Sequence, residues 1–231
     1  MLSALLGAHP PRLPAAALVR VGALFDIAEG TVRVALSRMV SAGDLAYTGG
    51  EYELTDRLRR RQTRQDQSRA PRTRNWRGRW EIAVVTAERR PPAERVAFRQ
   101  TMADLRLAEL RAGTWLRPDN LSRQRPDPVR EQCAFFTGRP DGDPAALAAS
   151  LWDLTAWSSR ATELLAALDE AEGLAGRFMV SAAVLRHLLA DPLLPPELLA
   201  PDWPGTALRD RHARFDESFQ SMLRGHLVMA G

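Results

Sequence analysis

The chain has 231 residues, of which 45% are hydrophobic, 26% charged and 6% aromatic. This composition excludes a chain that is disordered throughout, because enough apolar surface is available to form a core. The single cysteine, Cys133, excludes a disulfide framework and a zinc site built from paired cysteines. No stretch reaches the ~18 apolar residues of a membrane-spanning helix and no signal peptide is recognised, so a cytoplasmic protein without membrane contact is expected.

Positive charge is concentrated near the N-terminus. All 32 basic residues are arginines, and the net charge is +4. Residues 1–80 contain 14 arginines and 7 acidic residues, whereas residues 81–231 contain 18 arginines and 21 acidic residues. A GC-rich genome would explain the absence of lysine but not this asymmetry. The asymmetry predicts a basic N-terminal module with an anionic partner.

Three helices are predicted in the first 43 residues. Two short ones, over residues 2–8 and 15–24, are separated by prolines that interrupt a helix. The third is expected over residues 29–42, with Gly43 as a left-handed cap, because apolar residues repeat at the spacing of one buried face: Val32, Ala35, Leu36, Met39 and Val40. The opposite face presents polar and small residues, namely Gly30, Arg33, Ser37 and Ser41, with Arg38 at its edge.

A β-hairpin is predicted over residues 44–54. Two adjacent glycines, Gly49 and Gly50, supply the positive φ angles that a two-residue turn needs. Counting outward from this turn pairs Tyr47 with Tyr52 and Leu45 with Leu54. Because side chains alternate along a strand, both pairs lie on the face expected to dock on the helices. The other face is polar, and its acidic residues near the tip, Glu51 and Glu53, argue against deep insertion into a minor groove.

This order of helices and hairpin is typical of a winged helix-turn-helix, in which the second helix of the pair lies in the major groove of DNA. We therefore expect residues 29–42 to bind a double-stranded DNA operator. Arg33 has the bidentate fork that pairs with guanine, and Ser37 can donate or accept a hydrogen bond. The predicted DNA-binding residues are Thr31, Arg33, Ser37, Arg38, Arg59 and Arg60. Two alternatives remain: a helical packing unit with a solvated polar face, and a module that binds protein instead of DNA.

An arginine-rich connector helix is predicted after the hairpin, with Thr55 and Asp56 at its start. Residues 57–79 contain ten arginines and one acidic residue, Asp66. Such a run attracts phosphate without distinguishing base sequence. The alternative is a solvated linker, which is the commoner role of a charge run. The first domain is placed over residues 1–69.

Alternating patterns predict an α+β middle domain over residues 76–158. Strands are expected over residues 81–85, 112–117 and 132–137, with a long helix over 91–110 and another beginning near Pro144. Strand, helix, strand, strand, helix is most of a split β-α-β unit, so a ferredoxin-like domain is predicted.

The last domain, over residues 159–231, is predicted to be helical. Apolar stripes occur over 161–170 and, as Phe178, Ala182, Leu185 and Leu189, over the next helix. Residues 191–205 contain prolines that force an extended connection, and a final helix is expected over 206–227.

Two stretches resemble the PaaX family, the bacterial repressors of phenylacetic acid degradation operons. One is the predicted helix-turn-helix, Leu18 to Gly43, and the other is the segment Asp191-Pro-Leu-Leu-Pro-Pro-Glu-Leu-Leu199 with Asp202-Trp-Pro-Gly205. The order of the three domains is similar too. The family usually has Gly and Ser in the turn before the recognition helix, where this chain has Asp26 and Ala28. Ala28 lacks a capping oxygen worth ~1 kcal/mol.

The resemblance implies a homodimeric repressor that leaves its operator when an aryl-CoA effector such as phenylacetyl-CoA binds. Arginine forks suit the phosphates of such an effector, and aromatic rings suit its acyl group and adenine. The candidate effector-binding residues are Arg177, Arg186, Trp203 and Arg209, with Phe178 as a further aromatic. Ordinary surface ion pairs and core packing are the alternative roles of these residues. A nucleic-acid-binding protein without a CoA effector remains a second possibility.

No pattern of catalytic or metal-binding residues is found. The four histidines, at positions 9, 187, 212 and 226, do not have the spacing of metal ligands. CRISPR-associated nucleases, which the middle domain resembles in fold, hold a metal with an acidic residue after the first strand. Here that place is Val84-Val85-Thr86, without a carboxylate. The sequence therefore predicts no enzyme activity, no catalytic residue, no metal and no cofactor.

Overall fold

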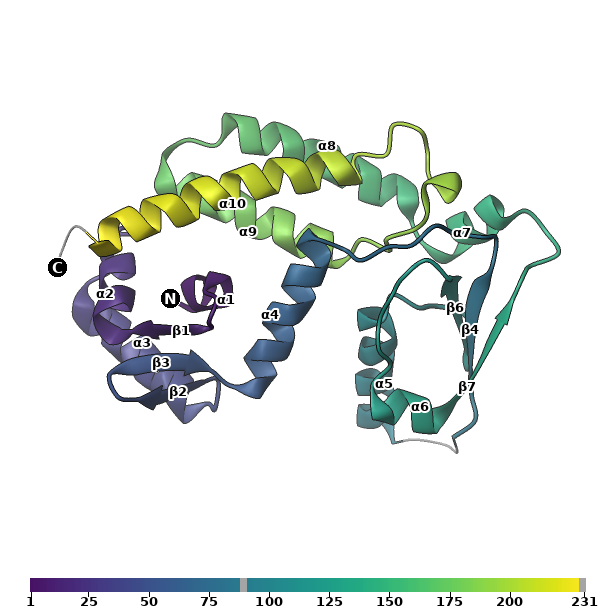
Figure 1. The fold of residues 1–231 in the computed structure, drawn as a ribbon, viewed down its shortest axis with the longest axis horizontal. Helices are drawn as coiled ribbons and strands as arrows, with labels where there is room; N and C mark the ends of the chain where they lie inside the picture. The colour runs from purple at the N-terminus through teal and green to yellow at the C-terminus, as the bar shows by residue number, and fades with distance from the viewer. Residues whose placement is uncertain (88–90, 229–231) are drawn as a thin grey trace. The chain divides into compact units, whose positions relative to one another are not determined.

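The computed structural model describes residues 1–87 and 91–228, with only the backbone described at positions 174, 219, 220 and 222–228. The protein is α+β, with helices and two antiparallel sheets (Figure 1). Its contacts group the chain into two compact units. Unit 1 consists of Met1–Arg69, Thr162–Leu189 and Thr206–Gly231, and unit 2 of Ala70–Ala161 and Ala190–Gly205. Within the described residues, no helix is long and apolar enough to cross a membrane.

Unit 1 begins with the helices and hairpin that the sequence predicts. The elements are α1 (Leu2–Gly7), β1 (Arg12–Pro14), α2 (Ala15–Ala23), α3 (Glu29–Ser41), β2 (Leu45–Thr48), β3 (Glu51–Leu54) and α4 (Asp56–Arg69). The predicted pairs Tyr47–Tyr52 and Leu45–Leu54 are confirmed, and Gly43 has a φ of 70°. β1 was not predicted, because a three-residue strand with a proline has no periodicity. It pairs with β3 and gives an antiparallel sheet in the order β1-β3-β2.

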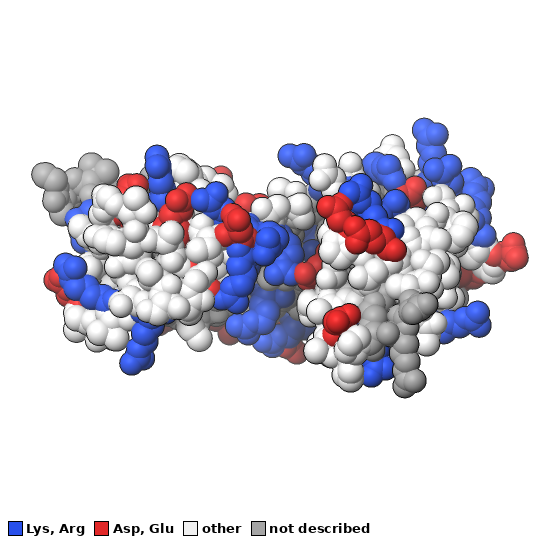
Figure 2. Space-filling model, turned by 90° about the horizontal axis from the view of Figure 1, so that it is seen from below, with Lys and Arg blue, Asp and Glu red and all other residues white. Residues whose placement is uncertain are grey.

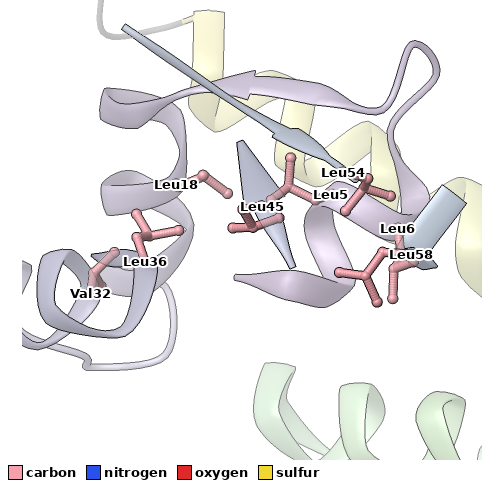
Figure 3. Packing of buried hydrophobic residues seen from close by; sticks show 8 residues of the cluster. All are labelled: Leu5, Leu6, Leu18, Val32, Leu36, Leu45, Leu54 and Leu58. Atoms are coloured by element: carbon pink, nitrogen blue, oxygen red, sulfur yellow. The ribbon is translucent and has the colours of Figure 1, made fainter. Parts of the chain in front are cut away.

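A leucine-rich core holds these elements together. It is formed by buried residues from α1, α2, α3, both hairpin strands and α4 (Figure 3): Leu5, Leu6, Leu18, Val32, Leu36, Leu45, Leu54 and Leu58. Only the leucine pair of the hairpin belongs to this buried core. Of the tyrosine pair, Tyr52 is half-buried and packs against the core, whereas Tyr47 is 53% exposed. The hairpin therefore docks through its base, and its outer end stays accessible.

Helices α2 and α3 pack closely where Gly22 faces Val32. A Cβ atom at Gly22 would lie 2.5 Å from Cγ2 of Val32, so only glycine lets the two helices approach this closely. Asp26 has a φ of 54°, a conformation that glycine adopts most easily and aspartate tolerates better than most residues. Aspartate at position 26, where the resemblance leads one to expect glycine, is thus compatible with the left-handed turn that leads into α3.

The C-terminal helices complete unit 1. They are α9 (Gly173–Leu189), α10 (Gly205–Val228) and the part of α8 (Leu154–Glu170) from Thr162 onward, and α9 packs against α4. The predicted stripe on α9 is one position out of phase, because the buried residues are Ser181, Val184 and Leu188. The apolar pattern missed this face because one of its buried residues is a serine. The Oγ of Ser181 lies 3.1 Å from Nε2 of His212 on α10.

Unit 2 is built on a four-stranded antiparallel sheet in the order β5-β6-β4-β7. Its elements are β4 (Trp80–Val85), α5 (Pro92–Asp104), β5 (Ala108–Arg111), β6 (Thr114–Pro118), α6 (Asp127–Gln132), β7 (Cys133–Gly138) and α7 (Pro144–Leu151). The expected helix over 91–110 is too long. It ends at Asp104 because Arg106 has a φ of 55°, and the strand β5 follows. Gly113 then makes the turn into β6, so the strand predicted from residue 112 starts later.

The proline-rich segment 190–205 is anchored by a buried arginine. The segment is extended apart from a short 3₁₀ turn, η1 (Pro196–Leu198). Arg117 on β6 is 0% exposed and donates hydrogen bonds to the carbonyl oxygens of Pro192 and Leu193, at 3.4 and 3.2 Å. Asn120 donates to the same Leu193 oxygen at 3.0 Å. These bonds hold Leu193 in a left-handed conformation with a φ of 53°.

Arg117 remains charged at neutral pH although no carboxylate of the described residues accepts a hydrogen bond from it. Burial is the main cause that lowers its pKa to about 9. Its remaining donors are satisfied by the carbonyls of Pro118 and Arg106 and by Oδ1 of Asn120. The guanidinium is thus solvated by protein dipoles in place of water.

Replacing Arg117 with methionine is expected to destabilise unit 2. Several carbonyls would lose their donor while remaining buried, and each such group costs about 1–3 kcal/mol. Urea unfolding followed by tryptophan fluorescence measures the loss. Arg111→Met, at an exposed position of β5, is the control and should change stability little. Equal stability of the two variants would contradict the anchoring role.

Acid is expected to destabilise unit 1 through His212. Its pKa is lowered from 6.5, first by burial and then by the nearby Arg69, while Asp216 and Ser181 oppose this change. Between pH 6.5 and the lowered value, the unfolded chain binds more protons than the folded one. Stability should therefore fall as the pH drops below about 6.5. Urea unfolding at several pH values checks this, and His212→Gln should have a shallower acid loss than the parent.

Candidate nucleic-acid interface

The outer face of α3 is the main candidate surface. Val32 and Leu36 are each 1% exposed in the core, which turns the opposite side of the helix to solvent. All residues on that side are exposed: Gly30, Thr31, Arg33, Val34, Ser37, Arg38 and Ser41. The four residues of α3 that the sequence singled out therefore lie together on one accessible face.

Arg33 is already bound within its own helix. Its Nη2 and Nε lie 2.6 and 2.7 Å from Oε1 of Glu29, one turn earlier. An exposed pair of this spacing is worth only about 0.3–0.5 kcal/mol. A base edge could therefore replace Glu29 at small cost, and until then the carboxylate fixes the direction of the guanidinium. The described structure records no ion pair for Arg38, whose charge remains available.

α4 places a second set of arginines beside the hairpin. Its inner face is buried through Leu58, Gln62, Gln65 and Ser68, and basic side chains gather over its outer face (Figure 2). Arg60 and Arg61 are exposed, and neither has an ion pair in the described part of the chain. Arg59 differs: it donates to the Leu54 carbonyl at 2.9 Å and lies 2.6 Å from Glu53. Of the two predicted residues on α4, Arg60 is available for phosphate and Arg59 is bound to the hairpin.

The acidic residues of the hairpin are paired. Oε1 of Glu53 contacts Arg59 at 2.6 Å, and Oε2 of Glu51 lies 3.8 Å from Nε of Arg12 on β1. The hairpin therefore presents less negative charge than its sequence indicates. The Arg12–Glu51 pair was not predicted from the sequence, because it depends on β1, which places Arg12 next to β3. Periodicity does not reveal a strand as short as β1. The tip, Gly49 and Gly50, is exposed.

The candidate effector residues do not form a single group. Arg177 lies over the Phe215 ring, with 5.7 Å from Cζ to the centroid, and Arg209 donates to the Ser68 carbonyl at 3.1 Å. Arg186 is exposed near the end of α9. Trp203 belongs to unit 2, where it stacks on Trp157 with centroids 4.6 Å apart. The further aromatic, Phe178, packs edge-on against Phe25. An effector role for these residues stays a prediction.

A hollow in unit 2 gathers arginines that the sequence did not single out. It has a volume of about 730 Å³ and is lined by Arg123, Gln124, Arg125, Pro126, Asp127 and Arg130. Buried Glu81 binds Arg123 at 2.9 Å and Arg125 at 2.7 Å. One buried carboxylate thus binds both arginines, so the cluster contributes to the packing of unit 2 as well as to its positive charge.

The other candidates for chemistry lie apart. His9 contacts Asp66 at 3.1 Å, His212 contacts Ser181, and Cys133 is buried. The side chain of His226 lies outside the described residues. Across the described residues, no group of three or more histidine, cysteine, aspartate or glutamate side chains could hold a metal ion.

Comparison with known proteins agrees with this arrangement. Residues 1–58 match the family model described as PaaX-like protein, and residues 151–227 match the model of the PaaX-like protein C-terminal domain. No curated protein matches the chain. Among solved structures, the chain is similar to an uncharacterized protein of Mycobacterium tuberculosis, Rv0674, at 44% identity and a TM-score of 0.82, over 98% of this chain and 97% of that one. The chain belongs to the PaaX-like family.

Proposed function

We propose that this protein is a transcriptional repressor that binds an operator with α3 in the major groove. The observation that favours this function most is the accessible face of α3, with Arg33, Ser37 and Arg38, beside the exposed arginines of α4. Arginine and serine side chains on one helix face can reach base edges, while arginines on the neighbouring helix can contact phosphates.

The arrangement of elements supports the finer fold assignment. In unit 1, α2, α3 and the β2–β3 hairpin follow the order of a winged helix-turn-helix, with α3 as recognition helix. In unit 2, a β-α-β-β-α-β order with adjacent antiparallel strands fits the ferredoxin-like domain that the sequence predicts. We propose both assignments on this basis.

Family membership supports the regulatory role. We infer that the chain acts in the cytoplasm as a homodimer on an operon for degradation of an aromatic acid of the phenylacetate type, and that an aryl-CoA effector releases it from DNA. A binding protein is favoured over an enzyme because the exposed side chains of α3 and α4 suit recognition of an anionic polymer. The hairpin adds to this surface, since Arg12 and Arg59 balance its acidic residues.

Operator binding should weaken steeply with salt and respond differently to two arginine variants. Arg33→Ala should cost about 1–3 kcal/mol on the operator and reduce its preference over random DNA. Arg60→Ala should weaken binding evenly on all sequences and lower the slope of log K against log salt by about one. Fluorescence anisotropy at several salt concentrations measures both effects.

Arg111→Ala, on unit 2, is the matched control for the loss of one positive charge. Small and equal effects of Arg33→Ala and Arg60→Ala would contradict the assignment of α3 as the recognition helix. Salt-independent binding to another protein would favour the alternative of an interaction module.

Addition of phenylacetyl-CoA should release the protein from its operator. A gel-shift titration with the thioester, with free coenzyme A and with phenylacetate separates the contributions of the acyl group and the nucleotide. An unchanged shift up to millimolar thioester would contradict the effector, and the DNA-binding proposal would then stand without it.

A further inference from the structure

Val34 is an apolar residue at the centre of the proposed recognition face. Its side chain is 52% exposed, whereas Val32, two positions earlier, is buried. A branched side chain has a lower helix propensity than alanine, so neither helix formation nor packing favours valine at this position. Valine here leaves an apolar surface on a face that is otherwise small, polar or basic.

Gly30 lies one turn before Val34 on the same face. A Cβ atom built on Gly30 would meet nothing within 4 Å, and its φ is not among the positive values that favour glycine. Gly30 is the second residue of α3. Neither packing nor backbone conformation within the chain requires glycine there, and alanine is the better helix former. At Gly22 the opposite holds, because Val32 blocks any side chain.

An open glycine is not informative by itself, since Gly176 on α9 is equally open. Gly30 becomes informative because of the residues that surround it on the helix face. Gly30 and Val34, which we call the apolar strip, lie between Arg33 and Arg38 on one helix face. Two guanidinium groups that attract DNA thus flank a place without charge and, at Gly30, without a side chain.

We propose that the apolar strip recognises thymine. The C5-methyl of thymine is the apolar group among the donors and acceptors of the major groove, and an apolar side chain is its natural contact. Val34 contacts this methyl, and the missing side chain at Gly30 lets the base edge approach the backbone of α3. The inference rests on the proposed function, because it requires α3 to lie in the major groove.

Single replacement of thymine by deoxyuridine tests the contact, because it removes only the methyl group. The full-length protein first selects its operator from fragments of its own upstream region and from a random pool. Each thymine of that operator is then replaced in turn, and binding is measured by anisotropy. We expect about a fivefold loss at one or two positions for the parent protein. Val34→Ala should bind thymine and deoxyuridine equally well at those positions.

Gly30→Ala tests the close approach with two measurements of opposite sign. The melting temperature should be unchanged or higher, because alanine favours the helix and meets no neighbour. Operator affinity should fall about tenfold or more, because the added methyl occupies the space of the base edge. Gly176→Ala, at an open glycine of α9, is the matched control and should leave operator affinity unchanged.

The outcomes separate this inference from the proposed function. Tight binding of the operator with every deoxyuridine tolerated would overturn thymine recognition while leaving operator binding intact. Unchanged affinity of Gly30→Ala would overturn the close approach. A parent protein that binds no fragment, even at low salt, contradicts the proposed function and this inference together.

Discussion

The orientation of α3 is fixed by the burial of Val32 and Leu36 in the leucine core of unit 1. Rotation of the helix would expose these side chains, at a cost of about 1.5–3 kcal/mol for each. The outer face is therefore set by the core, and the close packing of Gly22 on Val32 sets how near α2 lies. A surface positioned in this way can present side chains in a constant geometry, which base recognition requires.

Ion pairs within unit 1 divide its arginines into two groups. Arg12 and Arg59 compensate the acidic residues of the hairpin, and Arg57 pairs with Asp44. Arg38, Arg60 and Arg61 have no such partner in the described residues and remain exposed. Exposed pairs contribute little to stability, so their main effect is on the surface potential. The negative charges are neutralised near the hairpin, and uncompensated positive charge is left on α3 and α4.

The proline-rich segment 190–205 has a structural explanation in unit 2. Prolines and a left-handed leucine keep residues 191–194 from forming regular structure, so their carbonyl groups need other donors. Arg117 and Asn120, from β6 and the loop after it, supply those donors. The side chain of Asp191 contributes from within the segment by accepting a hydrogen bond from the Leu193 N–H at 2.7 Å.

The sequence alone determined the helices and hairpin of the first 69 residues, because amphipathic spacing and the Gly49-Gly50 turn are local signals. It also determined which face of residues 29–41 is accessible. Only the tertiary structure decided which charges are available, since the partners of Arg12 and Arg59 come from other elements. The strand at 108–111 and the role of Arg117 were likewise invisible. Strand pairing and burial of a charge depend on residues that are distant in the chain, which no local pattern specifies.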